Sequence, residues 1–173
     1  MIGSDRQLER WVVHHRAGWL DPVFEGLSYI GTFGLVWLAI ALVLALLWRR
    51  PMVFASVVAA VLVGDLTAFG LRHVIGRPRP WRRYALPEPL VHAPNDPSFP
   101  SGHTTMAFAG ATVLTYFRPR LAPVFFLLAA AIGFSRVYVG VHYPLDVLGG
   151  AALGCLVGLL VIVLLRLAAA RRR

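Results

Sequence analysis

Long runs without a charged side chain constrain this chain more than any other feature of its sequence. The run from Leu27 to Trp48 is long enough to cross the roughly 30 Å hydrocarbon core of a bilayer as a helix. Further apolar runs follow, at 52–71, 104–117, 121–134 and 147–165. They predict a single domain, residues 1–173, folded as an all-α, polytopic membrane helix bundle with about five transmembrane helices.

The segment 4–26 differs from these runs because acidic and basic side chains interrupt it throughout. It also carries Trp11 and Trp19, a residue type that gathers at the level of the lipid headgroups. We therefore expect an amphipathic helix lying in the membrane interface. No short apolar core followed by a cleavage site occurs at the N-terminus, so a secretory signal peptide is not predicted.

The basic side chains indicate how the bundle is oriented. All 17 are arginines, the formal net charge is +9, and they gather at the ends of the apolar runs, which argues against a nucleic-acid partner. The turns at 49–50 and 118–120 and the end at 171–173 fall on one side, which the positive-inside rule makes cytoplasmic. The loop 77–100 and the bend 135–146 are then expected to meet on the extracytoplasmic face.

The loop 77–100 holds seven of the twelve prolines and has little periodicity. A connection of this length is usually functional or disordered. A lid over a site and a merely flexible loop are both consistent with its composition.

Three polar clusters, at residues 72–80, 100–103 and 135–146, stand at the predicted extracytoplasmic ends of the runs. His142 and Asp146 are four residues apart, so on a helical turn the carboxylate can hold the imidazole ring. Guanidinium groups grip phosphate oxygens at two points, and a glycine at a helix start lets backbone amides approach an anion. The expected phosphate-binding residues are Arg72, Arg79, Ser101, Gly102 and Arg136.

Two histidines of these clusters, His142 and His103, favour phosphoryl transfer. His142 is the expected nucleophile, because Asp146 fixes its tautomer and stabilises the charge that develops as the ring attacks phosphorus. His103 is expected to protonate the leaving oxygen and then to activate water. This chemistry forms a phosphohistidine intermediate and needs no metal ion or other cofactor.

Three blocks of the chain resemble, in order and spacing, the tripartite signature of the phosphatidic acid phosphatase type 2 family. They are Arg72-x6-Arg79-Pro80, Pro100-Ser101-Gly102-His103 and Ser135-Arg136-x5-His142-x3-Asp146. The resemblance implies a metal-independent membrane lipid phosphatase with these residues in the roles given above, although the family usually has lysine where Arg72 stands. Similarity to its small bacterial carrier-lipid phosphatases implies undecaprenyl or another polyprenyl diphosphate as substrate, in a bacterial plasma membrane.

Several alternatives stay open. The substrate could instead be phosphatidylglycerol phosphate, phosphatidic acid or a polyprenyl-phosphoryl-sugar phosphate. A vanadium haloperoxidase shares the signature, although the apolar runs argue against it, and a non-catalytic lipid-binding or transport protein could keep the site as an anion receptor. The oligomeric state is not indicated.

Other charged residues are interpreted as structural. Asp65, inside a predicted span and two turns before Arg72, is interpreted as the ion-pair partner of that arginine, with a direct contact to the substrate as the alternative. Arg77, Arg82 and Arg83 are interpreted as anchors at the membrane surface.

Overall fold

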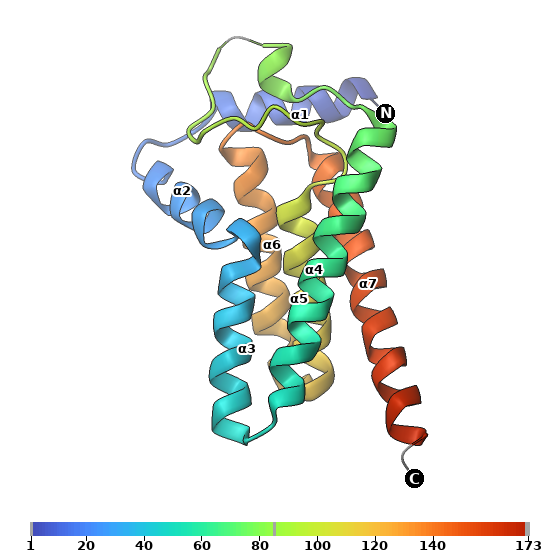
Figure 1. The fold of residues 1–173 in the computed structure, drawn as a ribbon. Coiled ribbons are helices and arrows are strands. Elements are labelled where there is room, and N and C mark those ends of the chain that lie inside the picture. Colours follow the sequence, from blue (N-terminus) through green and yellow to red (C-terminus); the bar gives the residue numbers. More distant parts are fainter. Residues whose placement is uncertain (1, 85, 172–173) are drawn as a thin grey trace.

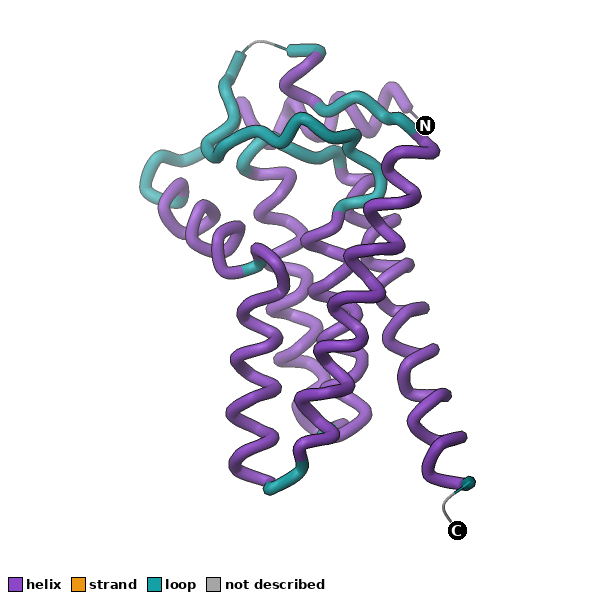
Figure 2. The backbone as a smooth tube through the Cα atoms, viewed as in Figure 1, coloured by secondary structure: helices purple, strands orange, loops and turns teal. Residues whose placement is uncertain are grey.

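The computed structural model describes residues 2–84 and 86–171, and every regular element in that part of the chain is a helix (Figure 1). The α-helices are α1 (Ile2–His14), α2 (Asp21–Ile30), α3 (Leu35–Trp48), α4 (Pro51–Ile75), α5 (Gly102–Phe117), α6 (Ala122–Tyr138) and α7 (Pro144–Ala170). The short 3-10 helices are η1 (Thr32–Gly34), η2 (Pro80–Arg82) and η3 (Pro119–Leu121). Helices α3 to α7 form an elongated bundle, and most of the irregular chain gathers at one end of it (Figure 2). The predicted all-α bundle is confirmed.

The number of membrane spans is only partly settled by helix length. Within the described residues, three helical segments are long and apolar enough to cross a bilayer: 51–82, 119–138 and 144–170. The pair α2 and α3 passes the same test only if it crosses as one broken span, bent by 57°. Helix α5 has 16 residues, fewer than the roughly 20 that a full crossing needs. Five spans therefore remain a prediction.

The first predicted span is interrupted in the structure. Residues 31–34 break the helix between α2 and α3, with positive φ angles of 53° at Phe33 and 68° at Gly34. A Cβ atom at Gly34 would lie 2.8 Å from a methyl carbon of Val61, so glycine permits both the left-handed backbone and the close approach to α4. The break brings Thr32 to the polar end of the bundle.

The N-terminal segment also differs from its prediction. Instead of one amphipathic helix over 4–26, the chain forms α1 and the first part of α2, joined by residues 15–20. Gly18 favours a turn there, and Pro22 fits the first turn of a helix but not its interior. Helix α1 consequently runs across the end of the bundle, next to the loop that follows α4 (Figure 1).

Helix α5 lies at the centre of the bundle, in contact with α4, α6 and α7. Its contact with α7 is close because glycines of α7 face it: a Cβ atom at Gly150 would lie 2.7 Å from the carbonyl oxygen of Ser101, and one at Gly158 would lie 2.6 Å from Cβ of Thr112. Large apolar side chains instead cover the outside, as expected of a bundle surrounded by hydrocarbon; they include Leu62, Leu127 and Leu156.

Candidate active site

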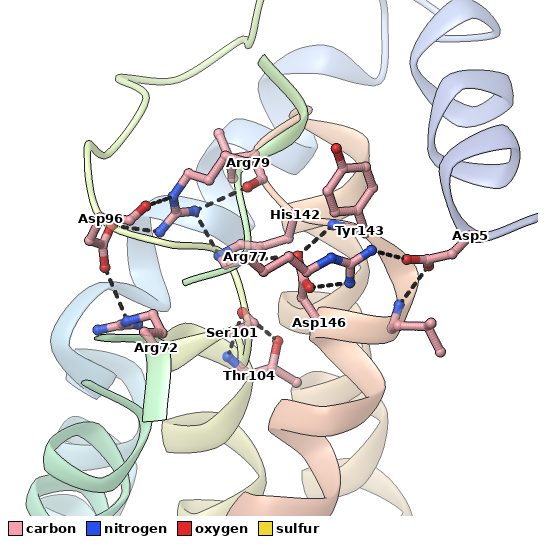
Figure 3. Close-up of polar contacts among 12 residues, drawn as sticks. Asp5, Arg72, Arg77, Arg79, Asp96, Ser101, Thr104, His142, Tyr143 and Asp146 are labelled. Atoms are coloured by element: carbon pink, nitrogen blue, oxygen red, sulfur yellow. Dashed lines mark hydrogen bonds and ion pairs between the residues drawn. The ribbon is translucent and has the colours of Figure 1, made fainter. Parts of the chain in front are cut away.

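The imidazole of His142 lies in the bend between α6 and α7, where its side chain is only 2% exposed. Its Nδ1 is 3.4 Å from Oδ2 of Asp146, in the first turn of α7, as the spacing in the sequence predicted (Figure 3). Asp146 is fully buried and also accepts a hydrogen bond of 2.9 Å from the backbone N–H of Tyr143. Because a carboxylate only accepts, Nδ1 carries the proton and Nε2 keeps its lone pair.

Arg79 brings a guanidinium group to that lone pair. Its Nη1 lies 3.1 Å from Nε2 of His142 and donates to the carbonyl oxygen of Val141 at 3.0 Å. Its other edge donates to Asp96, from Nε to the backbone oxygen at 2.8 Å and from Nη2 to Oδ1 at 2.7 Å. The loop and the bend therefore fix this cation next to Nε2 of His142 (Figure 3).

Arg72, at the end of α4, shares the carboxylate of Asp96 with Arg79. Its Nε is 3.0 Å from Oδ2 of Asp96. The predicted partnership with Asp65 is therefore wrong: within the described part of the chain, the ion pair of Arg72 is made with the loop, and Asp65 lines the nearby cavity. Asp65 precedes Arg72 on the same helix, whereas the loop folds back over the guanidinium. A Cβ atom at Gly102 would lie 2.5 Å from Nη1 of Arg72, which explains the glycine.

Arg136 and His103 find their polar partners on the N-terminal part of the chain. Arg136, only 4% exposed, donates from Nη1 to the hydroxyl of Ser28 on α2. Nε2 of His103 lies 3.3 Å from the hydroxyl of Thr32 in the broken segment. Sequence reasoning missed both hydroxyls; the signal available was two polar residues four apart within an otherwise apolar run.

Ser101 has a different place from the other predicted phosphate-binding residues. It is the N-cap of α5, where its hydroxyl accepts hydrogen bonds from the backbone N–H of Thr104 at 3.4 Å and from the hydroxyl of Thr104 at 3.0 Å. Its side chain is fully buried, and it does not line the cavity that the other residues share. Its visible task is to fix the start of the helix that carries Gly102 and His103.

Two adjoining cavities open among these groups. The smaller, about 340 Å³, is where the arginines and both histidines meet; its lining includes Asp65, Arg72, Arg79, Asp96, Gly102, His103, Arg136 and His142. The larger, about 630 Å³, lies between α2 and the loop and is mostly lined by other residues, including Glu25, Tyr29, Val91 and His92. His103, Arg136, Thr32 and Pro94 line both.

The prediction that Arg77 is an anchor at the membrane surface is wrong. The side chain of Arg77 is 17% exposed, and its Nη1 donates to Oδ1 of Asp146 at 2.6 Å. Its Nη2 pairs with Oδ2 of Asp5 on α1. Arg82 and Arg83, further along the loop, are exposed, and their role as membrane-surface anchors stays a prediction. The signal available in the sequence was that Arg77 stands two residues before Arg79, which belongs to the signature.

The protonation state of His142 follows from its surroundings. The pKa of the ring is lowered to about 4, mainly because the ring is buried. The hydrogen bond to Asp146 raises the pKa and offsets part of this effect, whereas the positive charge of Arg79 lowers it further. At neutral pH the ring is therefore uncharged, with a lone pair on the nitrogen that faces the arginines. An uncharged imidazole held by a carboxylate is the form of histidine that attacks an electrophile.

Fold and site together define a class of protein: a helical membrane enzyme whose converging cations and buried histidine suit phosphoryl transfer. Comparison with known proteins identifies it further. The sequence profile of the PAP2 superfamily matches residues 52–169, and the chain belongs to that family. It is a lipid phosphatase, as the names of its relatives support.

Two curated relatives and one solved structure illustrate the likeness. The chain is 34% identical to the decaprenylphosphoryl-5-phosphoribose phosphatase of Mycobacterium tuberculosis, over 79% of this chain and 76% of the relative. It is 29% identical to the undecaprenyl-diphosphatase BcrC of Bacillus subtilis, over 85% of this chain and 75% of the relative. The crystal structure of Aquifex aeolicus LpxE superposes with a TM-score of 0.78 at 32% identity, covering 90% of this chain and 93% of that one.

The contacts of Asp96 lead to a first prediction. Its carboxylate occupies donors of Arg72 and Arg79 that a phosphate could use, and both arginines hold its pKa below the usual value although burial alone would raise it. We expect Asp96→Asn to be inhibited by inorganic phosphate about tenfold more strongly than the wild type, because a competing negative charge is removed.

The measurement is the inhibition constant of phosphate in a lipid phosphatase assay. Glu88→Gln is the matched control, because Glu88 is an exposed carboxylate of the same loop. Weaker inhibition of Asp96→Asn would mean that the carboxylate is needed to hold the two guanidinium groups and does not compete with the anion.

Proposed function

We propose that this chain removes a phosphate from a polyprenyl diphosphate, with undecaprenyl diphosphate as the first choice, without a metal ion and through a phosphohistidine intermediate. The observation that carries the proposal is the ring of His142, with Nδ1 on Asp146 and Nε2 toward Arg79 in a cavity that Arg72 and Arg136 also line. A nucleophile and the cations that neutralise phosphate oxygens thus share one cavity.

The reaction follows from these positions. Nε2 of His142 forms a bond to phosphorus while the bond from phosphorus to the leaving oxygen breaks, and His103, which must start this step as an imidazolium, gives its proton to that oxygen. Water, losing a proton to His103, then attacks the phosphohistidine and releases inorganic phosphate together with the free ring. Asp146 balances the positive charge on the ring, and Arg72, Arg79 and Arg136 hold the phosphate oxygens.

A diphosphate is favoured because Arg136 lines both cavities. One phosphate can bind in the smaller cavity, beside His142, while the guanidinium also contacts a second phosphate in the larger one. The relative from Bacillus subtilis that is named an undecaprenyl-diphosphatase supports the same substrate. Phosphatidylglycerol phosphate, phosphatidic acid and a polyprenyl-phosphoryl-sugar phosphate are the alternatives, and a phosphoribose relative supports the last of them.

The deciding experiment measures release of inorganic phosphate from a panel of these lipids, side by side in detergent and with a chelator present. We expect the largest kcat/KM with the polyprenyl diphosphate. A higher value with another lipid would reassign the substrate, and loss of activity on adding the chelator would overturn the metal-independent mechanism. Halide oxidation after vanadate loading, with no phosphate release from any lipid, would identify a haloperoxidase instead.

The pH dependence of this reaction is a second prediction. The attacking ring must be uncharged, so activity is present above its pKa and lost as the pH falls through that value, which is about 4. An ordinary histidine would lose activity near pH 6.5. We therefore expect the acid limb of kcat/KM to lie well below 6, at the same pH for a monophosphate and a diphosphate substrate. An acid limb near 6.5 with both substrates would contradict the proposed state of His142.

We also propose that the site faces the extracytoplasmic side of a bacterial plasma membrane. The arginine turns at Arg49, Arg50, Arg118 and Arg120 lie at the end of the bundle opposite the site (Figure 1), and basic side chains favour the cytoplasmic side. In a Cys155→Ala background, a membrane-impermeant thiol reagent should label Glu88→Cys in intact cells and Arg120→Cys only after permeabilisation. The reverse pattern would invert the orientation.

A further inference from the structure

We infer that Asp5, on the N-terminal helix α1, is a positioning residue of the catalytic His142–Asp146 pair and acts on it through Arg77. This inference rests on the proposed function, because it assigns a task relative to the same nucleophile. On this inference, α1 contributes a residue that positions the catalytic pair and does not only cover the end of the bundle.

A continuous chain of charged groups links the two ends. Oδ2 of Asp5 pairs with Nη2 of Arg77, Nη1 of Arg77 donates to Oδ1 of Asp146 at 2.6 Å, and Oδ2 of Asp146 faces Nδ1 of His142 at 3.4 Å (Figure 3). Asp5 is 5% exposed and Asp146 is fully buried. Buried charged groups hold their partners much more firmly than exposed ones, because water does not compete for the same donors.

The second oxygen of Asp5 acts on the same helix that carries Asp146. It accepts a hydrogen bond of 2.9 Å from the backbone N–H of Leu145, in the first turn of α7. That N–H has no partner within the helix, so Asp5 satisfies it from outside, as an N-cap would. One carboxylate from α1 thus fixes both the backbone before Asp146 and the arginine that holds its side chain.

The charges explain why two acidic residues surround one arginine. Without Asp5, the whole positive charge of Arg77 would act on Asp146, and that carboxylate would stabilise a positively charged ring less well. Pairing with Asp5 shares the charge of Arg77 between two carboxylates. The ring of Tyr143, 4.2 Å from the guanidinium carbon, covers the same group from another side. Arg77 can therefore orient Asp146 while leaving it negative enough to serve His142.

The test compares Asp5→Asn with Glu9→Gln, using wild type and His142→Ala measured in parallel. Glu9 lies one turn further along α1 and is equally buried, but no hydrogen bond or ion pair joins it to Arg77 among the described residues. We expect Asp5→Asn to lower kcat about tenfold or more with KM within about twofold, and Glu9→Gln to keep kcat within about twofold. Asp5→Glu, which keeps the charge, should regain most of the loss.

A double-mutant cycle separates positioning from folding. Asp5→Asn keeps an oxygen that accepts from the backbone N–H of Leu145, and in an Arg77→Gln background it has no cation to lose, so adding it should lower kcat no further. Equal, independent losses in both backgrounds, or an Asp5→Asn enzyme with wild-type kcat, would overturn the inference while leaving the proposed function intact. Failure of the proposed function would look different, because His142→Ala would then turn over as fast as the wild type.

Discussion

Replacing His142 by alanine is expected to lower the rate of phosphate release by about a thousandfold or more. Nε2 of the ring lies 3.1 Å from Nη1 of Arg79, and removing the ring leaves the phosphate site without the proposed nucleophile. Binding can survive, because Arg72, Arg79 and Arg136 remain. The loss should therefore appear in kcat, while the inhibition constant of inorganic phosphate changes little.

The experiment needs a control for folding, because His142 is buried against Asp146. His142→Gln keeps a polar side chain at that position and should be as inactive as the alanine variant. His73→Ala is the matched control, because His73 is exposed near the end of α4 and, among the residues that the structure describes, its ring bonds to its own helix at the carbonyl oxygen of Phe69. Wild-type turnover by both His142 variants would disprove the mechanism.

The second large effect is expected at Arg79, where we predict that Arg79→Lys lowers kcat about a hundredfold. Lysine keeps the charge but loses the planar fork, and Arg79 uses that fork on two sides at once. One edge is fixed by Asp96, and Nη1 lies between the carbonyl oxygen of Val141 and Nε2 of His142. A single ammonium group cannot keep the anchor and reach the phosphate.

Arg82→Lys is the control for this prediction, because Arg82 is an exposed arginine of the same loop that donates to the carbonyl oxygen of Asn95. It should keep kcat within about twofold of the wild type. The readouts are kcat and the inhibition constant of inorganic phosphate. The inhibition constant should rise for Arg79→Lys and stay unchanged for Arg82→Lys. If the two lysine variants are equally active, the guanidinium of Arg79 does not contact the transferred phosphate.

The loop over 77–100, for which both a lid and a flexible segment were considered, is tied to the rest of the molecule at many points. Its backbone carbonyls at Glu88 and Leu86 accept from Arg16 and Arg10 of the N-terminal segment, and the N–H of Leu90 donates to the carbonyl oxygen of Val139 at 3.1 Å. Asp96 ties it to the arginines. Because these contacts hold the described part of the loop over the site, the side chain of Val91 lines the larger cavity.

Most of the site could be predicted because its signals are local. The four-residue spacing of His142 and Asp146 brings the ring to the carboxylate, although His142 lies in the bend just before α7 and not on a helical turn. Gly102 follows the N-cap of a helix, and apolar runs with arginines at their ends predict membrane helices. These patterns depend on backbone geometry over a few residues, which the sequence specifies directly. The all-α fold and the assignment to lipid phosphatases followed from them.

The partners of the charged residues could not be predicted in the same way. Arg77 pairs with Asp5, 72 residues away, and Arg136 donates to Ser28, 108 residues away. Arg72 pairs with Asp96, although Asp65 is closer to it in the sequence. Each pairing depends on how helices pack and where a loop folds back, and similar charges at other positions would have fitted the sequence equally well.

The sequence by itself therefore determined the class of fold, and it supplied the residues that we propose as nucleophile, carboxylate partner and phosphate-binding arginines. Only the tertiary structure decided that the helix breaks at residues 31–34, that α1 crosses the end of the bundle, and that Asp5, Ser28, Thr32 and Asp96 contact the proposed site or its neighbours. The difference arises because helical periodicity relates residues that are close in the sequence. Ion pairs and hydrogen bonds in a buried site instead join groups that the packing brings within about 3 Å, however far apart they are in the sequence.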